Sequence, residues 1–297
     1  MANGIEFLLS YTGNSADSNE IDLYDVAKAL HGFQRTLALT THLILNDEII
    51  THATALKGAK IYTFPAEEGS WNINSSIVIT SLFAFGMAQS NSPIGHLAFS
   101  IYDYVISESL GFHVDYNKSI GQLIEENKAK KTPLPNIKQY QADSLIEKCE
   151  NAIIEMHRPI YVSKTATTAH IYSIATPQAR RPKIKTPIKA PLTLESYNFI
   201  SDTRTSDKPE KFKGKISSYN SNTFKGRIYI ADFGRPIPFE LSEKIRTEAT
   251  IRLITESLSI NAIDHSDNSS IIYCLAYTVT TKKGHLKGIK IIDVSSS

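Results

Sequence analysis

Two pairs of histidine and aspartate residues have a spacing that suits acid–base chemistry. In His113-Val114-Asp115, the first and third side chains would share one side of a strand. His96 and Asp103 lie seven residues apart, on one face of a predicted helix. A carboxylate can orient an imidazole for general acid or base catalysis. Neither pair has a nucleophile at a recognisable spacing, so the sequence favours a non-enzymatic function and leaves catalysis by His113 and Asp115 as an alternative.

Metal and cofactor motifs are absent from the sequence. Neither of the glycine-rich phosphate loops G-x-G-x-x-G and G-x-x-x-x-G-K-[ST] occurs. The polar run from Asp264 to Asn268 lacks the glycine and the distal glutamate of a calcium loop. Cys149 and Cys274 have no Cys or His partner at zinc-like spacing. We therefore expect no metal and no cofactor.

A long window without charge separates Glu68 from Asp103. Because it contains no Asp, Glu, Lys or Arg, it must lie in a protein core, in an assembly interface or against lipid. Its apolar runs, Ile77 to Ala88 and Ile94 to Ile106, are shorter than the about 20 residues of a membrane-spanning helix. These lengths favour protein over lipid as the surroundings, and they predict a helical hairpin hinged at residues 90–95.

This hairpin is the predicted surface for self-association. A homo-oligomer would bury its large apolar side chains, whereas insertion of the same hairpin into a membrane after a trigger is the alternative. The side chains expected in the interface are Leu82, Phe83, Phe85, Leu97, Phe99 and Ile101.

Length and composition indicate an ordinary folded protein. The 297 residues suggest two domains, and 41% hydrophobic with 21% charged residues is near the globular average. The opening MANGIEFLLSYTG lacks the basic start and long apolar run of a signal peptide, and the two cysteines lie far apart. We therefore expect a reduced, cytoplasmic protein, with membrane association as the alternative.

The net charge of +2 conceals an asymmetry along the chain. Residues 1–155 carry 10 Lys and Arg against 18 Asp and Glu, whereas residues 156–194 carry seven bases and no acid. Four prolines among five bases in PQARRPKIKTPIKAP are typical of an extended connector. We place a linker at 176–195, between domains 1–175 and 196–297. The basic stretch is either a strap for nucleic acid or acidic lipid, or a linker docked on the acidic first domain.

The first domain is predicted to mix helices and strands. Apolar residues at spacings of three and four predict a helix from Leu23 to about Asn46, with Asp22 as its N-cap. Further helices are expected at 95–110, 117–130 and 139–157, and strands at Ile5–Tyr11, Lys60–Phe64, Trp71–Val78, Ile160–Val162 and His170–Ile174.

The second domain has a recognisable order of elements. Strands are expected at Lys213–Tyr219, Phe224–Ala231, Ile237–Leu241, Ser270–Thr280 and Gly288–Val294, with a helix at about Thr247–Ile260 after the third. Three strands, a helix and two strands is the order of an oligonucleotide-binding (OB) barrel. The predicted fold class is therefore α+β: a mixed domain with an uncharged helical hairpin, followed by a small five-stranded OB-like β-barrel.

Residues 214–230 of this domain, GKISSYNSNTFKGRIYI, resemble the start of cold-shock and related barrel domains. The matching positions are Gly214, Tyr219, Asn220, Lys225, Gly226 and Tyr229, whereas Arg227 and Ile228 replace the aromatic residue and the glycine that those families use for base stacking. The resemblance implies a strand that binds single-stranded nucleic acid through exposed aromatic rings beside cations. The residues that would provide both are Tyr219, Lys225, Arg227, Tyr229 and Arg235. Packing of the two tyrosines inside the barrel is the alternative.

Nearly the whole chain resembles an uncharacterised bacterial family of unknown function. The resemblance is carried by IDLYDVAKALHGFQRTLALTTHLIL, by SPIGHLAFSIYDYVISESLGFHVDY and by the terminal barrel. Genes of this family are often neighbours of mobile elements and phage-defence loci, so the resemblance implies that context and no active site.

These features favour a non-enzymatic binding or assembly protein. It would self-associate through the hairpin and present its barrel to a protein or to a single-stranded nucleic acid. The alternatives are a membrane-acting effector that inserts residues 77–106 into lipid, and an enzyme that uses His113 and Asp115.

Overall fold

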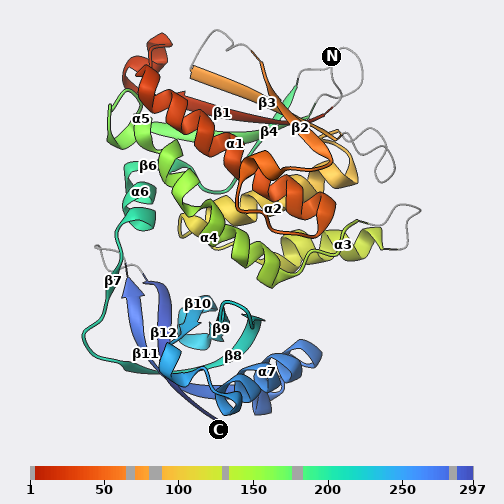
Figure 1. Ribbon diagram of the computed structural model, residues 1–297, viewed down its shortest axis with the longest axis vertical. Coiled ribbons are helices and arrows are strands. Elements are labelled where there is room, and N and C mark those ends of the chain that lie inside the picture. The colour runs from red at the N-terminus through yellow and green to blue at the C-terminus, as the bar shows by residue number, and fades with distance from the viewer. Residues whose placement is uncertain are drawn as a thin grey trace. The chain divides into compact units, whose positions relative to one another are not determined.

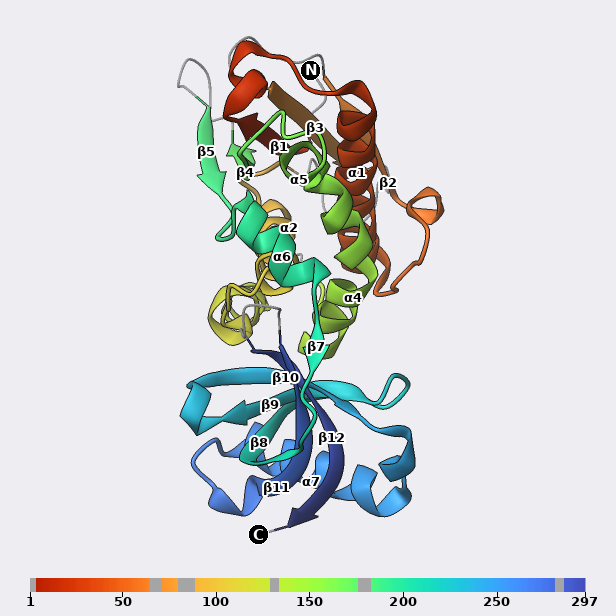
Figure 2. The same cartoon turned by 90° about the vertical axis from the view of Figure 1, so that its left-hand side faces the viewer.

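The computed structural model describes residues 4–64, 71–79, 89–128, 134–175, 183–280 and 286–296. The chain divides into two compact units, Met1–Ile200 (unit 1) and Ser201–Ser297 (unit 2), and each is described by itself. Figures 1 and 2 show helices beside a sheet in unit 1 and curled strands with one long helix in unit 2. The predicted α+β fold class is confirmed.

Unit 1 combines one antiparallel sheet with a layer of helices. Its helices are α1 (Leu23–Asn46), α2 (Pro93–Ser109), α3 (Gln122–Asn127), α4 (Gln139–Met156), α5 (Arg158–Tyr161) and α6 (Leu194–Ser201). A π-helical turn, Asn117–Gly121, leads into α3. Its strands are β1 (Ile5–Thr12), β2 (Ala59–Thr63), β3 (Trp71–Ile79), β4 (Thr168–Ala175), β5 (Ile184–Pro187) and β6 (Leu192–Thr193). They follow the order β2-β3-β1-β4-β5, with β6 paired to β4.

Strand β1 lies at the centre of this sheet, and its side chains form the middle of the core. Phe7, Leu9 and Tyr11 alternate along it and are buried in one apolar cluster. The Phe7 ring packs on Tyr102 of α2 at 5.0 Å between centroids, and the Tyr11 hydroxyl donates to the Met156 carbonyl of α4 at 2.7 Å. Figure 1 shows α1 and α4 side by side in the helical layer.

Much of the described part of the uncharged window lies in this core. Strand β3 pairs with β1 on one side and β2 on the other, and α2 buries Leu97 and Ile101 completely. A charge at these positions would be desolvated without a partner, which explains the composition of the window. The first arm of the expected helical hairpin differs, because residues 77–79 continue β3 as a strand. Residues 80–88 lie outside the described residues.

Several local predictions are confirmed. Helix α1 has the expected bounds, and its N-cap Asp22 accepts a hydrogen bond from the Asp25 amide at 3.0 Å. Its buried face includes Val26, Phe33 and Leu37 as predicted, although Leu23 at its start is 81% exposed.

The predicted strand Ile160–Val162 is wrong, because Arg158–Tyr161 forms the short helix α5. Pro159 sits in its first turn, where the missing amide hydrogen costs nothing. The Arg158 guanidinium then bonds the buried Asp25 of α1 at 2.9 Å, and this pair fixes the turn.

Unit 2 is a closed five-stranded mixed barrel. Its strands are β7 (Arg204–Thr205), β8 (Glu210–Asn220), β9 (Lys225–Ile230), β10 (Arg235–Leu241), β11 (Ile271–Thr280) and β12 (Leu286–Ser296), and its helix is α7 (Glu248–Ile263). The five long strands close in the order β8-β9-β10-β12-β11-β8, with β10 and β12 parallel and the other pairs antiparallel. Strand β7 adds to β11. The small five-stranded barrel predicted from the element order is confirmed.

The barrel core is formed by alternate residues of the strands and by one face of α7. Ile216, Ile228, Ile237 and Ile291 point inward from four strands, and α7 adds Ile254 to the cluster. Figure 1 shows α7 alongside β8. Within the described ranges of the whole chain, every helix is too short or too polar to cross a lipid bilayer.

Candidate functional site

The predicted nucleic-acid residues of β9 do not share one environment. Ile228 and Ile230 fill the barrel core, so the predicted register of the strand is right. Tyr229 points outward and is 41% exposed. Arg227 is on the same side of the strand, yet it is only 3% exposed. A phosphate cannot reach a buried guanidinium, so Arg227 is a poor contact, and Lys225 is half-buried.

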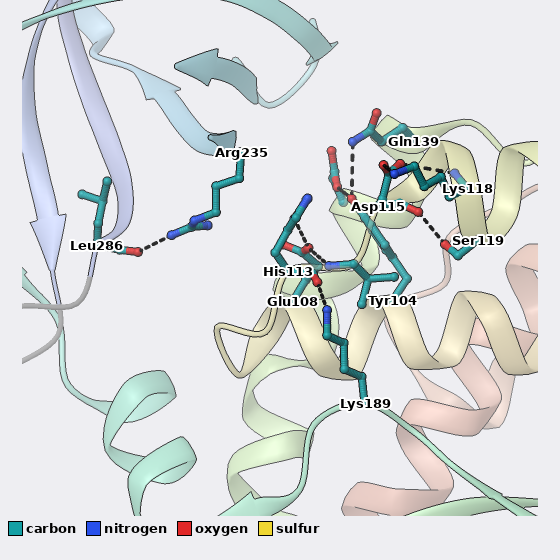
Figure 3. A network of polar contacts seen from close by, with 12 residues as sticks. Tyr104, Glu108, His113, Asp115, Lys118, Ser119, Gln139, Lys189, Arg235 and Leu286 are labelled. Atoms are coloured by element: carbon teal, nitrogen blue, oxygen red, sulfur yellow. Dashed lines mark hydrogen bonds and ion pairs between the residues drawn. The ribbon is translucent and has the colours of Figure 1, made fainter. Parts of the chain in front are cut away.

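Two further predicted residues have structural roles inside unit 2. Tyr219 is buried and stacks on Phe239 with 6.3 Å between ring centroids, and burial raises the pKa of its hydroxyl. It therefore belongs to the barrel interior, which was the alternative to base stacking. Arg235 donates from Nη2 to the Leu286 carbonyl at 3.1 Å and ties β10 to the start of β12 (Figure 3).

A row of lysines on the neighbouring strand β8 provides exposed cations better than the predicted residues of β9 do. Lys211, Lys213 and Lys215 alternate with Phe212 and Gly214, which are buried. Alternate residues of a strand share a face, so the three lysines lie on the outer surface with their Cα atoms about 7 Å apart along the strand. Lys211 and Lys213 are exposed and Lys215 is half-buried.

Exposed tyrosines flank this row on both sides. Tyr273 of β11 is directly opposite Lys213, 42% exposed, with the lysine Nζ 5.9 Å from its ring centroid. Tyr229 of β9 is directly opposite Lys215. The five residues define an outward surface across three adjacent strands, the lysine–tyrosine face: Lys211, Lys213, Lys215, Tyr229 and Tyr273.

The positive charge of this face is concentrated at Lys211 and Lys213. The Lys215 ammonium donates to the His265 carbonyl at 2.8 Å, in the loop that follows α7. Asp264 and Asp267 of that loop have lowered pKa values, first through hydrogen bonds from Ser266 and Ser269 and to a smaller extent through Lys215. These carboxylates offset part of the charge at one end of the face.

Sequence reasoning missed this face although its signal was present. The run Lys211-Phe212-Lys213-Gly214-Lys215 places a cation at every second position, which is the pattern of a strand with one charged side. The expected strand began at Lys213 and therefore divided the run. Tyr273 had no separate signal, because its position opposite Lys213 depends on the long-range pairing of β11 with β8.

The predicted catalytic pair is separated in the structure. Residues 112–115 form an irregular segment after α2, and His113 bonds Glu108 through Nδ1 at 2.8 Å instead of Asp115 (Figure 3). Glu108 also accepts from the Val114 amide at 2.7 Å. Asp115 accepts from the Lys118 amide at 3.2 Å and caps the π-helical turn. The prediction that His113 and Asp115 share the side of a strand is wrong, because two local capping bonds determine this segment.

The basic stretch 156–194 also makes polar contacts with this segment and with other parts of unit 1. Figure 3 shows Lys189 reaching the His113 carbonyl, to which its ammonium donates. The Lys189 amide donates to Asp103 Oδ1 at 2.6 Å, and burial raises the pKa of Asp103. Lys183 pairs with Glu6 at 3.8 Å. His96, the other half of the second predicted pair, is exposed.

The predicted interface residues fall into two groups. Leu97 and Ile101 are fully buried in the core of unit 1, and Phe99 packs partly buried against it. Leu82, Phe83 and Phe85 lie outside the described residues, so their role in self-association stays a prediction.

Both cysteines are enclosed. Cys149 and Cys274 are free thiols in the cores of different units, and burial raises the pKa of each to about 12. A thiol held neutral is a poor nucleophile. In the described ranges, no group of three or more His, Cys, Asp or Glu side chains is arranged to hold a metal ion.

Two family models account for most of the chain, one in each unit. Residues 7–190 match the family described as domain of unknown function DUF7946, and the chain belongs to this family. Residues 208–295, which include the whole lysine–tyrosine face, match the family of unknown function DUF7947. None of the curated proteins matches the chain.

Proposed function

We propose that this protein is a non-enzymatic binding protein whose barrel binds single-stranded nucleic acid on the lysine–tyrosine face. The observation that carries the proposal is the strand register, which places Lys213 opposite the exposed ring of Tyr273 and Lys211 two residues away on the same face of β8. Exposed rings beside cations are what a single strand requires, because bases stack on the rings while the cations neutralise phosphates.

Stacking on the two rings would contribute to the binding energy. Stacking of one base on an aromatic ring is worth about 1 to 3 kcal/mol, and the face has two such rings. Both are about two-fifths exposed, so a base can reach them without rearrangement of the strands. Lys213 already lies near the Tyr273 ring, which positions the cation for a phosphate beside a stacked base.

The OB-like topology and the cold-shock resemblance support a nucleic-acid ligand, although the proposed contacts differ from those the resemblance implies. Arg227 and Tyr219 are buried, and Lys211, Lys213 and Tyr273 take their place. The resemblance to a family encoded near mobile elements and phage-defence loci supports a biological setting in which foreign single strands are the ligand. A protein partner on the same face is the competing outcome of the test.

The first experiment measures binding of a 5′-hydroxyl oligothymidine of about 12 nucleotides, within the site size of one barrel, by fluorescence anisotropy at several salt concentrations. Affinity should fall as salt rises, because bound phosphates release counterions. Removal of two phosphate contacts in Lys211→Ala/Lys213→Ala should reduce the slope of log K against log salt by about 1.4. Lys118→Ala/Lys128→Ala removes the same charge from unit 1 and should leave the slope unchanged.

The second arm separates stacking from charge. Tyr273→Ala should weaken binding by about 5- to 150-fold, because one stacked base is lost. Tyr273→Phe keeps the ring and should bind like the original protein. No binding of any single-stranded DNA or RNA at low salt would refute the proposal and favour a protein partner.

A further inference from the structure

A second surface of the barrel is hollowed into a groove of about 620 Å³. It lies over the outer side of β11 and β12, between β7 and the turn that follows β10. Its volume is within the range of about 300 to 1,000 Å³ that is usual for small-ligand sites. The side chains that shape it are Thr205, Ser242, Lys244, Tyr277, Lys290 and Ile292, with Ser206 in the wall.

The register of the two strands brings the main groups together. Tyr277 of β11 is directly opposite Lys290 of β12, so the ring and the ammonium are neighbours on the outer face. Ser242 is held at the other side of the groove by its amide, which donates to the Ile291 carbonyl at 2.8 Å. Lys244 follows two residues later, in the short 3-10 helix Glu243–Ile245.

The charges in the groove are of one sign. Lys244 and Lys290 are both exposed, and within the described part of the chain neither has an ion-pair partner. Among the described residues, no carboxylate lines the groove, although Glu243 and Asp293 are next to lining residues in the sequence. Two unneutralised ammonium groups facing one hollow attract an anion, and phosphate suits lysine well.

The polar and apolar walls have separate roles. The Ser206 hydroxyl accepts from the Thr278 amide at 3.0 Å and donates to the Lys208 carbonyl at 2.9 Å, so it holds the wall in place. Thr205 and Ser242 offer further hydroxyl groups. Tyr277 and Ile292 supply a ring and an aliphatic surface on which a planar group can rest.

We propose that this groove binds one phosphate-bearing nucleotide unit. Lys244 and Lys290 hold the phosphate, and the base lies against Tyr277 and Ile292. The nucleotide is either free in solution or the phosphorylated end of a strand. The inference goes beyond the proposed function, because the groove shares no residue with the lysine–tyrosine face.

The test uses the full chain and two probes. Calorimetry with AMP measures the free nucleotide, and anisotropy with 5′-phosphorylated and 5′-hydroxyl oligothymidine measures the strand end. Lys244→Ala/Lys290→Ala should weaken AMP binding by about tenfold or more, whereas Lys211→Ala/Lys213→Ala should not change it. Tyr277→Phe should retain binding that Tyr277→Ala loses. Thermal melting checks that each variant is folded, and Lys244→Gln/Lys290→Gln replaces the alanine pair if it is not.

Each result supports or overturns nucleotide binding in the groove. AMP binding that depends on Lys244 and Lys290 supports the groove and a free nucleotide. A preference for the 5′-phosphate that disappears in the same double variant supports the groove and a strand end. Absence of both effects, or AMP binding that is equally sensitive to Lys211 and Lys213, overturns the inference. Failure of every 5′-hydroxyl single strand, DNA or RNA, to bind at low salt would refute only the proposed function.

Discussion

At the scale of single residues, His157 shows how a buried titratable group can be structural. It is completely buried at the end of α4. Its Nδ1 donates to the Ile153 carbonyl at 2.8 Å, and its Nε2 shares a hydrogen bond of 2.9 Å with the Ser196 hydroxyl of α6. A neutral imidazole has one donor and one acceptor, so the neutral form can satisfy both nitrogens here. Burial lowers the pKa of this histidine to about 4.

This lowered pKa predicts a dependence of stability on pH. The unfolded histidine has a pKa of about 6.5, so as pH falls the unfolded state takes up the proton first. The contribution of His157 is therefore complete above about pH 6.5 and is lost as pH falls towards 4, by roughly 3 kcal/mol in total. Urea unfolding at about pH 7 and about pH 5 should show a lower free energy of unfolding at the lower pH.

The matched variants isolate this residue from the other histidines. His157→Gln removes the titrating group, so the difference between the two pH values should shrink. His52 is exposed, and His52→Gln should keep the full difference. If His157→Gln and the original protein lose the same free energy between the two pH values, the assignment of the effect to His157 is wrong.

At the scale of elements, the close approach of α1 and α4 depends on one glycine. A Cβ atom at Gly32 would lie 2.2 Å from the backbone oxygen of Ala152 in α4. A backbone oxygen cannot rotate away as the end of a side chain can, so the helices would have to separate. Ala29 of α1 and Ala152 of α4 are also small and buried.

We predict that Gly32→Ala destabilises the protein by about 1 to 3 kcal/mol or more, through overpacking. Gly121 provides the control, because it is also helical and the nearest atom to a Cβ there is 3.5 Å away. Gly121→Ala should be neutral or stabilise by about 0.5 to 1 kcal/mol. Both free energies come from chemical denaturation at neutral pH. A Gly32→Ala protein as stable as the original would show that the helices can move apart without cost.

Local patterns made most elements of this fold predictable. The periodicity of α1 and its cap at Asp22 were sufficient to place the helix, and the alternation along β9 gave its inward face. The sequence Ile160–Val162 misled because three apolar residues fit a strand as well as a helical turn, and the deciding Arg158–Asp25 bond joins distant segments. Short runs without tertiary information are ambiguous for this reason.

The candidate site was less predictable than the fold. Tyr229 was identified because its exposure follows from alternation, but the burial of Arg227 and Tyr219 depends on how strands and loops close around them. His113 was paired with Asp115 by spacing, whereas its partner Glu108 is brought near by the end of α2. Residues that meet across strands, such as Lys213 with Tyr273 and Tyr277 with Lys290, need the sheet register.

At the scale of the whole molecule, the described residues form two separate cores. The buried cluster of unit 1 extends from Ile5 to Ile200, and that of unit 2 from Phe212 to Ile291. Neither cluster includes a described residue of the other unit. The barrel is closed through the β11–β12 pairing, so its five long strands leave no open edge for aggregation.

We therefore predict that residues 201–297 fold alone. Domains of about 60 residues can do so when their core is sufficient, and this unit has a closed barrel with a covering helix. The isolated unit should unfold cooperatively in urea. It should also bind the 5′-hydroxyl oligothymidine with an affinity within about threefold of the full chain, because the lysine–tyrosine face lies entirely within it.

Residues 1–200 provide the decisive comparison, because they contain the whole basic stretch 156–194. If that stretch were a strap for nucleic acid, the isolated unit 1 would bind the strand. We predict that it does not, since three of its cations are already engaged within unit 1: Arg158 with Asp25, Lys183 with Glu6, and Lys189 with the His113 carbonyl. Binding by unit 1 alone, with none by unit 2, would transfer the function from the barrel to the basic stretch.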